Sequence, residues 1–490
     1  MKRPILTSDA NAQDLTNGCV TRERPVVPAT DIRTTELPGR LKGLTLPKQV
    51  LVLAIWPLLE QFMNVFVGTV DLSLAGHLQP ESLAVSATDG LGVGGFVGWL
   101  MAMIQSSAAV GSAALISRAI GGRHRGLANA ALGQAIILGA VTGGLVGLAI
   151  FLLARPIGAI TGLRGDGLAL CTMYLRIISL AAPASGMLMA GNAALRAAGD
   201  TRSPFIVMIV VNVLNTALSV LFVFGPAPIG GHGVTGIACG TVGAWLVGTL
   251  LVLIVLMRAR GGIRLHAGRL RPHWHTMRRI IQIALPNLFE GAVGMWLGNF
   301  LVLMIVGRLE QEAVLGAHQT VIRVESLSFL PGFAMSIAAS TLAGQYLGMS
   351  DTTRARRAVF ICWAWGTAIM AFMGAIFVIV PELLVRIITN AEPLLELAPT
   401  PLRICGPFQV FLATRMILAG ALRGAGDTRS VMIFTLTSTF LVRLPAVYVL
   451  AVVLDLGLNG VWYGMCGEMV VSAVLVGIRF SRGKWTQARV

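Results

Sequence analysis

The sequence predicts an all-α polytopic membrane protein with twelve transmembrane helices in two pseudo-symmetric six-helix bundles. Its composition, its apolar runs and an internal repeat lead to this fold class. Of the 490 residues, 55% are hydrophobic and 12% are charged, and the mean hydropathy is +0.77. A water-soluble protein cannot bury that much apolar surface, so we expect the lipid bilayer to surround most of the chain.

The predicted spans are apolar runs that carry few charges. Each is at least close to the roughly 20 residues that a helix needs to cross a bilayer. Gly, Ala, Ser and Thr are frequent within them, which lets neighbouring helices approach closely. The predicted spans cover residues 49–76, 83–117, 127–154, 170–194, 204–225, 233–257, 277–306, 313–346, 356–380, 398–421, 431–453 and 459–479.

A polar segment occurs twice in the chain. Residues 194–203 read ALRAAGDTRS and residues 421–430 read ALRGAGDTRS, so nine of ten positions agree at a constant offset of 227. Chance would rarely repeat a polar decapeptide between long apolar runs, which indicates two copies of one unit. Each copy holds an even number of spans, so the copies run parallel, and this is a common plan for a transporter.

Basic residues lie mainly on one side of the predicted membrane topology. Of the 38 Lys and Arg residues, 29 lie in the terminal segments and in the loops on the same side as both decapeptides. By the positive-inside rule, we expect both termini to be cytoplasmic in an inner or plasma membrane protein. The net charge of +16 then reflects topology and attraction to lipid headgroups, and we expect no nucleic-acid partner.

The predicted domain boundaries follow from the spans. We expect residues 1–45, which lack an apolar stretch, to form a disordered cytoplasmic tail. Residues 46–257 would form the N-lobe and residues 277–480 the C-lobe. The Arg-rich residues 258–276 would be a cytoplasmic linker and residues 481–490 a second cytoplasmic tail. We expect the protein to be a monomer.

The repeated decapeptide connects the fourth and fifth spans of each lobe, and turn and capping chemistry accounts for its residues. Gly199 and Gly426 allow a tight turn, and Asp200 and Asp427 can cap the helix that follows. We therefore expect a loop clamp and not a substrate site. The arginines expected to face the cytoplasm are Arg196, Arg202, Arg423 and Arg429.

Four motifs in order resemble the multidrug and toxic compound extrusion (MATE) transporters. They are residues 69–78 (TVDLSLAGHL), Leu285-Pro286 followed by Glu290, residues 342–348 (LAGQYLG), and the doubled LRxAGDTR. The resemblance covers about residues 45–480. It implies two six-helix lobes in a V shape and antiport of organic, often cationic, drugs against H⁺ or Na⁺.

Asp71 is the leading candidate for cation coupling. It lies late in the first span and has no Lys or Arg within four residues, and an ionisable group inside a span is a functional candidate by default. It also matches the aspartate that the family uses for coupling. Asn215 and Ser219 lie one helical turn apart in the fifth span. Many relatives have Asn-x-x-x-Asp there, so Ser219 removes one carboxylate and favours H⁺ over Na⁺.

Candidates for the substrate cleft lie in the C-lobe. Glu290 matches a glutamate of many relatives and would attract a cation, although a simple helix N-terminal charge explains it equally well. For its counterpart Glu60, a simple helix N-terminal charge is the better explanation. Gln345 is a polar candidate, and Met295 and Met335 have flexible side chains that suit a cleft for varied drugs.

Two pairings across helices are also expected. Arg323 would pair with Glu290, and Arg415 or Arg443 would pair with Glu468. The six cysteines are isolated, which indicates neither a metal site nor a disulfide framework.

The predicted function is a secondary active multidrug efflux antiporter without a cofactor, with H⁺ or Na⁺ as the coupling ion. The alternative is a flippase of lipid-linked saccharides, or another exporter of the same superfamily. Mostly acidic site candidates disfavour a flippase, which would need a cationic cavity for pyrophosphate. A membrane-embedded enzyme would need a catalytic cluster at one membrane face, and the sequence contains no such cluster. A major-facilitator carrier would need an acidic loop after the second span, and residues 117–126 have no carboxylate.

Overall fold

The computed structural model describes residues 36–37, 39–78, 80–226, 228–259, 262–266, 268, 270–309 and 312–488. The described residues from Leu37 onward belong to one compact unit, and every regular element within them is a helix. Eleven helices are long and apolar enough to cross a membrane, and a bent pair makes a twelfth span. The predicted fold class is therefore confirmed.

Seven helices form the N-lobe, and their bounds lie within a few residues of the predicted spans. They are α1 (Leu46–Gly76), α2 (Glu81–Gly121), α3 (Arg125–Ile160), α4 (Gly165–Leu180), α5 (Ala182–Ala197), α6 (Arg202–Phe224) and α7 (Gly233–Met257). The fourth predicted span is the pair α4 and α5, which meet at an angle of 54°. Pro183 in the first turn of α5 explains the break, because proline has no N–H to continue the hydrogen bonds of α4.

The C-lobe repeats this plan with more interruptions. Its elements are α8 (Trp274–Phe289), η4 (Glu290–Leu297), α9 (Gly298–Val306), α10 (Val314–Gly348), α11 (Thr352–Ile379), α12 (Pro381–Ile388), α13 (Glu392–Leu397), α14 (Pro399–Cys405), η5 (Gly406–Phe408), α15 (Gln409–Gly424), α16 (Thr428–Thr437), η6 (Ser438–Arg443), α17 (Leu444–Tyr448), η7 (Val449–Val453) and α18 (Gly457–Ser481). The segments η4, η6 and η7 are wider π-helical turns inside continuous spans. Such turns often occur at functional sites, and here they carry Glu290 and Arg443.

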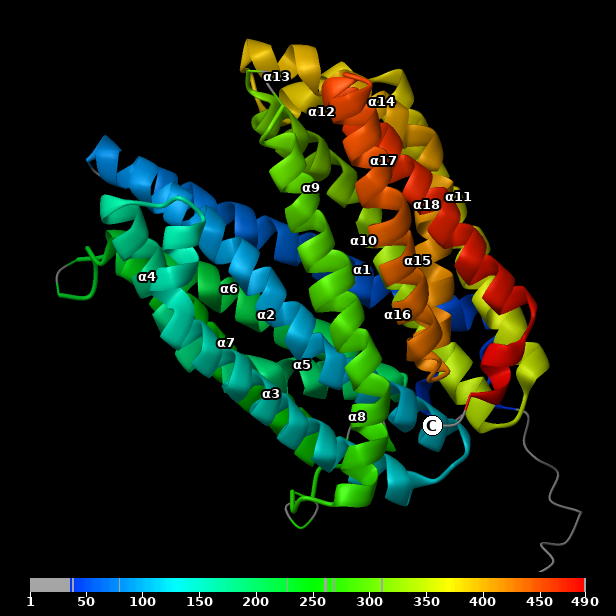
Figure 1. Ribbon diagram of the computed structural model, residues 1–490. Coiled ribbons are helices and arrows are strands. Elements are labelled where there is room, and N and C mark those ends of the chain that lie inside the picture. The colour runs from blue at the N-terminus through cyan, green and yellow to red at the C-terminus, as the bar shows by residue number, and fades with distance from the viewer. Residues whose placement is uncertain are drawn as a thin grey trace, which may run out of the picture. The chain divides into compact units, whose positions relative to one another are not determined.

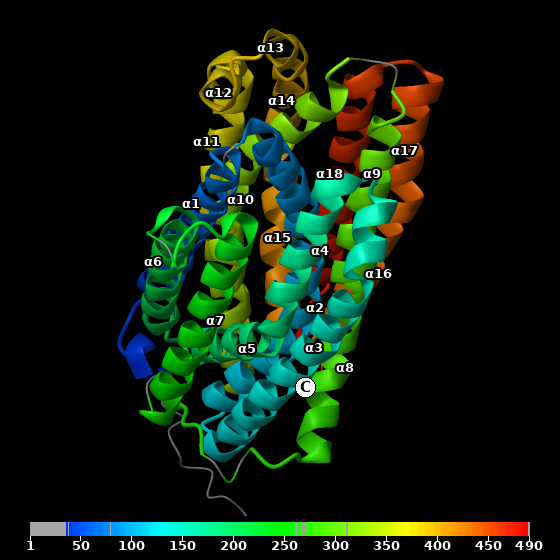
Figure 2. The same cartoon turned by 90° about the vertical axis from the view of Figure 1, so that its left-hand side faces the viewer.

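Each lobe packs around its own long central helices. In the N-lobe, α3 packs on α2, α4 and α5, and α6 lies along α7 (Figures 1 and 2). In the C-lobe, α10 packs on α11 and α15, while α18 packs on α15 and α17. The lobes meet where α2 contacts α8 and α10, and where α1 contacts α10 and α11.

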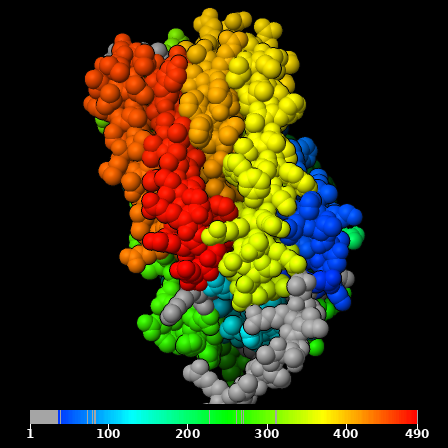
Figure 3. Space-filling view, turned by 90° about the vertical axis from the view of Figure 1, so that its right-hand side faces the viewer, coloured from blue at the N-terminus to red at the C-terminus, as the bar shows by residue number. Residues whose placement is uncertain are grey.

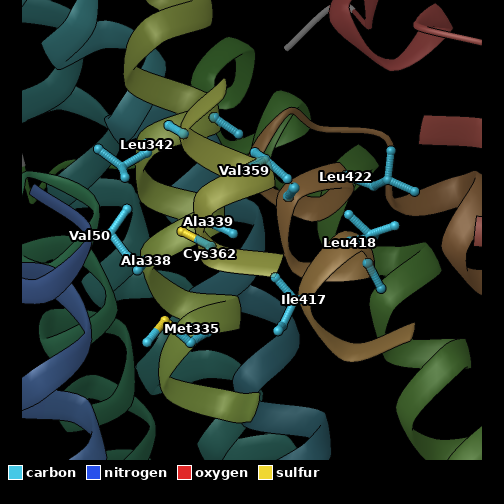
Figure 4. Close-up of a cluster of buried hydrophobic side chains, with 14 of the residues drawn as sticks. Val50, Met335, Ala338, Ala339, Leu342, Val359, Cys362, Ile417, Leu418 and Leu422 are labelled. Carbon is cyan, nitrogen blue, oxygen red and sulfur yellow. The ribbon is translucent and has the colours of Figure 1, made fainter. Parts of the chain in front are cut away.

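Residues 37 and 39–45, just before α1, are described and in part buried, so the predicted disordered tail does not hold for them. A short 3₁₀ helix, η1 (Gly39–Leu41), begins there, and the side chains of Leu37 and Leu41 are each only 1% exposed. Both belong to a hydrophobic cluster that also holds Val50 of α1 and residues of α10, α11 and α15 (Figure 4). Figure 3 shows this start of α1, in blue, beside the yellow surface of α11. The rest of the predicted tail, residues 1–35, lies outside the described residues.

The linker and the C-terminal segment also pack against the helices. Ile263 and Leu265 of the linker are buried in the N-lobe core. Trp485, in the 3₁₀ helix η8 (Lys484–Gln487), is fully buried and stacks on Phe480 at 5.2 Å between ring centroids. The Ala488 carbonyl accepts a hydrogen bond of 2.5 Å from Arg118 of α2, so the C-terminal segment connects the two lobes.

Candidate functional site

A cavity of about 510 Å³ lies between the lobes. Residues of α1, α2, α4, α5, α6 and α7 line it from the N-lobe, and residues of α10 and α15 line it from the C-lobe. Trp245, Phe333, Met101 and Met189 give it apolar walls, whereas Gln105 and Asn192 are among its polar lining residues. A cavity of this size between helices is typical of small-molecule sites.

The repeated decapeptides form tight turns, as predicted. Gly199 has φ +91° and Gly426 has φ +90°, a left-handed conformation that favours glycine. Asp200 caps α6, because its carboxylate accepts hydrogen bonds from the Ser203 N–H at 3.1 Å and the Ser203 hydroxyl at 2.7 Å. Asp427 differs: it accepts a hydrogen bond from the Ser430 hydroxyl at 2.7 Å but none from a backbone N–H of α16.

The aspartates of both decapeptides also hold distant segments of the chain. Arg40 pairs with Asp200 at 2.8 Å, and Arg479 of α18 pairs with Asp427 at 2.8 Å. Each decapeptide therefore also binds an arginine from outside its own sequence, in addition to forming the predicted turn.

The first arginine of each decapeptide points inward, contrary to the expectation that all four face the cytoplasm. Arg196 pairs with Glu60 of α1, and Arg423 pairs with Glu290 at the start of η4. Each lobe thus holds one Glu–Arg pair at corresponding positions of the repeat. The second arginines, Arg202 and Arg429, are exposed.

Two expectations for the glutamates need correction. Arg323 is exposed and does not pair with Glu290, whose described partners are Arg423 and the Thr435 hydroxyl. Glu60 is more than a helix N-terminal charge: it lies fourteen residues into α1, is only 6% exposed, and lines the cavity. Helix α10 carries Arg323 on its exposed face, which periodicity alone did not indicate.

The candidate coupling residues lie in the N-lobe where α1, α6 and α7 meet. Ser219 faces the Asp71 carboxylate, yet neither Asp71 Oδ1 nor Ser219 Oγ completes a hydrogen bond of ordinary geometry. Asn215 donates a hydrogen bond to Thr241 Oγ1 at 2.9 Å, and its own Oδ1 is buried without a partner. Buried oxygens normally have partners, so these oxygens have unused capacity to accept a hydrogen bond.

A polar contact between α1 and α6 lies at the cavity, on the same two helices as Asp71 and Asn215. Asn212 donates to Asn64 Oδ1 at 3.2 Å, which joins α6 to α1 two helical turns from Asp71. Asn64 lines the cavity. Tyr174 of α4 also lines the cavity. Among the described residues, Asp71 forms no ion pair with Lys, Arg or His.

None of the four predicted cleft residues belongs to the described lining of the cavity: Glu290 pairs with Arg423, and the other three pack elsewhere. Gln345 is fully buried in the contact between the lobes, where it donates a hydrogen bond to the Ala197 carbonyl at 2.8 Å. Met335 packs in the hydrophobic cluster of α10, α11 and α15 (Figure 4). Met295 is half-buried in η4. Met side chains suit a core as well as a cleft, so residue type could not separate the two.

The lobes are in direct backbone contact at the end of the bundle that holds the decapeptides. A Cβ on Gly121 of α2 would lie 1.9 Å from the Gln345 carbonyl oxygen, and one on Gly344 would lie 1.9 Å from Ser117 Oγ. Thr341 of α10 also donates a hydrogen bond to the Arg196 carbonyl at 3.2 Å. The cavity is therefore closed toward this end.

The C-lobe contains a buried charge network that was predicted only in part. Glu468 pairs with Arg443 at 2.7 Å and lies 3.9 Å from Arg415, so both arginines that were expected as alternative partners of Glu468 are beside it. Glu325, only 3% exposed, accepts hydrogen bonds from Cys405 at 3.2 Å and from Gln409 at 3.4 Å. The sequence did not predict the contacts of Glu325 with Cys405 and Gln409, which are 80 and 84 residues away from it. No group of three or more His, Cys, Asp or Glu in the described part of the chain is arranged to hold a metal ion.

Comparison with known families and proteins agrees with the two-lobed structure. The MatE family model matches twice, over residues 58–221 and 289–449, once in each lobe. A probable multidrug resistance protein NorM from Thermotoga maritima is 30% identical over 90% of this chain and 94% of its own length. Another protein of that name, from Acinetobacter baylyi, is 26% identical over 91% of this chain and 98% of its own.

Solved structures show the same fold. A MOP superfamily transporter from Pyrococcus furiosus superposes with a TM-score of 0.82 at 19% identity, over 91% of this chain and 97% of its own. A MATE crystal structure in the bent conformation gives a TM-score of 0.82 at 20% identity, over 90% of this chain and 96% of its own.

Proposed function

Because the chain belongs to the MatE family, we propose that it is a multidrug efflux transporter that exports organic compounds in exchange for H⁺. The names of its relatives support drug export. The closed contact at the decapeptide end and the cavity between the lobes support alternating access, in which the lobes rock to expose the cavity to either side. We place both termini and the decapeptides on the cytoplasmic side of the cell membrane, since the basic residues gather there.

The Asp71 site is the observation that carries the coupling proposal. Asp71 is half-buried within a span, and one of its oxygens has no hydrogen-bond partner. Proton uptake would remove the cost of a charge in this position. Because α1 contains Pro57, protonation at Asp71 would favour a bend of α1 that narrows the cavity and weakens cargo binding.

A proton is favoured over Na⁺ by the ligands in reach. The site offers one carboxylate, from Asp71, with the neutral oxygens of Asn215, Ser219 and Thr241 nearby. Hard cations such as Na⁺ are held by several oxygen ligands, and a second carboxylate at position 219 would have strengthened such a set. Ser219 supplies a neutral hydroxyl oxygen but no carboxylate.

Export from proteoliposomes under an imposed pH gradient or Na⁺ gradient tests this function. Fluorescent organic cations, neutral compounds and anions would serve as cargo. We expect the pH gradient to drive export and Asp71→Asn to abolish it. Asp166→Asn, which changes an exposed carboxylate in the first turn of α4, is the matched control and should transport normally. Undiminished pH-driven export by Asp71→Asn would exclude coupling through this residue.

A further inference from the structure

The charged residues that line the cavity are Glu60, Arg196 and Arg423, within the described part of the chain. Two of the three are cationic, whereas the family resemblance predicted a cleft that attracts cations through Glu290. Glu290 is behind Arg423 and is not among the lining residues. The four charges of the two pairs balance, but two of the three charged residues that line the cavity are arginines.

The arginine is the more exposed member of each Glu–Arg pair. The Arg196 side chain is 19% exposed against 8% for Glu60, and the Arg423 side chain is 22% exposed against 3% for Glu290. Glu60 accepts a hydrogen bond from Nη2 of Arg196, and Glu290 accepts hydrogen bonds from Nη2 and Nε of Arg423. A guanidinium carries five N–H groups, and within the described part of the chain no hydrogen bond engages Nη1 of either arginine, so these donors can serve a ligand.

We propose that the cargo carries an anionic group, such as a carboxylate, sulfonate or phosphate, on an apolar body, and that Arg196 and Arg423 bind this group. The inference rests on the proposed export function and names its class of substrate. Guanidinium groups bind carboxylate and phosphate oxygens with strong charge-assisted hydrogen bonds. Glu60 and Glu290 are positioning residues that hold the two guanidinium groups; Glu60 lines the cavity beside Arg196, whereas Glu290 is outside the described lining.

The rest of the cavity suits the apolar body. Trp245 and Phe333 offer aromatic faces, and Met101 and Met189 are flexible enough to pack against varied shapes. Few charges lie in these walls, so the anionic group would be drawn toward the two arginines. Since Arg196 belongs to the N-lobe, Arg423 to the C-lobe, and both line the same cavity, a cargo molecule held there has a guanidinium group of each lobe beside it.

Binding of matched pyrene probes to the full-length protein in nanodiscs tests this inference. The probes are pyrenebutyrate, its uncharged amide, and a pyrenebutyl trimethylammonium cation, and energy transfer from tryptophan reports protein-bound probe. We expect the carboxylate to bind roughly tenfold or more tightly than the amide, and the cation to bind more weakly than the amide. Tighter binding of the cation than of the amide would overturn the proposal.

Removing one member of a buried ion pair leaves an unpaired charge, which destabilises the fold. We therefore replace both members of each pair together. Glu60→Gln with Arg196→Gln, and Glu290→Gln with Arg423→Gln, should each lower carboxylate affinity roughly tenfold while amide affinity stays within about twofold. Arg429→Gln, an exposed arginine of the same decapeptide, is the control and should bind like the native protein. Equal losses for carboxylate and amide would mean that the pairs act only on structure.

Competition identifies the source of the anion. Displacement of pyrenebutyrate by naphthoate indicates a free organic acid, whereas displacement by a short-chain phosphatidate indicates a lipid headgroup; displacement by neither contradicts the proposal. The binding assay needs no gradient. A protein that binds the carboxylate selectively but exports nothing under a pH gradient would refute the transport function and keep the anion site. Export by a protein that does not bind the carboxylate probe preferentially would keep the transport function and refute the anion site.

Discussion

Replacing Gly121 with alanine should open the contact between the lobes at the decapeptide end. Gly121 is the last residue of α2, and its Cβ would lie 1.9 Å from the Gln345 carbonyl oxygen and 2.7 Å from the Gln345 carbonyl carbon. Both are backbone atoms, so no side-chain rotation relieves the clash. Since ordinary contact begins near 3.4 Å, α2 and α10 must separate by about 1.5 Å.

That separation would stretch the hydrogen bonds that span the contact. The bonds from Gln345 to the Ala197 carbonyl, at 2.8 Å, and from Thr341 to the Arg196 carbonyl, at 3.2 Å, are the nearest. Overpacking a well-packed contact typically costs about 1–3 kcal/mol. A cost confined to the closed arrangement would shift the equilibrium toward the open one by about 5- to 150-fold.

Spin-label distances between the lobes measure this shift. Labels on Arg202→Cys and Arg429→Cys, both exposed and one in each lobe, would report the separation in a background without the native cysteines. We expect Gly121→Ala to add or enrich a longer distance. Gly92→Ala in the same helix, where a Cβ meets nothing within 4 Å, should leave the distribution unchanged. Identical distributions for Gly121→Ala and Gly92→Ala would refute the reasoning.

Two further predictions concern stability in detergent. Arg423→Ala should lower the Tm strongly, since breaking a buried pair costs about 3–5 kcal/mol, whereas Glu290→Gln with Arg423→Gln should lower it much less; equal losses would mean that pairing is unimportant. Trp485→Ala should also destabilise, because loss of a fully buried Trp that stacks on Phe480 costs about 3–5 kcal/mol. An unchanged Tm would show that the C-terminal segment does not hold the helices together.

The sequence predicted the spans well because bilayer thickness and apolar length determine them directly. The seventh helix, Gly233–Met257, begins and ends where the predicted span does. The predicted turns at Gly199 and Gly426 rest on an equally local cause, the cost of positive φ for other residues. Neither prediction needed knowledge of which helices meet.

The errors came from contacts between distant segments. Leu37 and Leu41 looked like tail residues because the residues before α1 contain no apolar stretch, yet the cluster that buries them consists mainly of residues about 300 or more positions away. Gln345 and Met335 lie on a helix whose buried face serves both the lobe contact and the C-lobe core. Periodicity shows that a face is buried but not what covers it.

The two copies of the repeat agree in their Glu–Arg pairs and differ at the proposed coupling site. Glu60 with Arg196 and Glu290 with Arg423 are the same pair in each lobe. The register that aligns Gly76 with Gly307 places Asp71 opposite Val302, which is buried in the C-lobe core. A cargo that lies between two similar lobes can use a group from each, whereas a coupling ion needs one site whose occupancy changes one lobe. Duplication thus supplied the symmetric arginines, and later divergence at position 71 or its counterpart supplied the asymmetry on which coupling would depend.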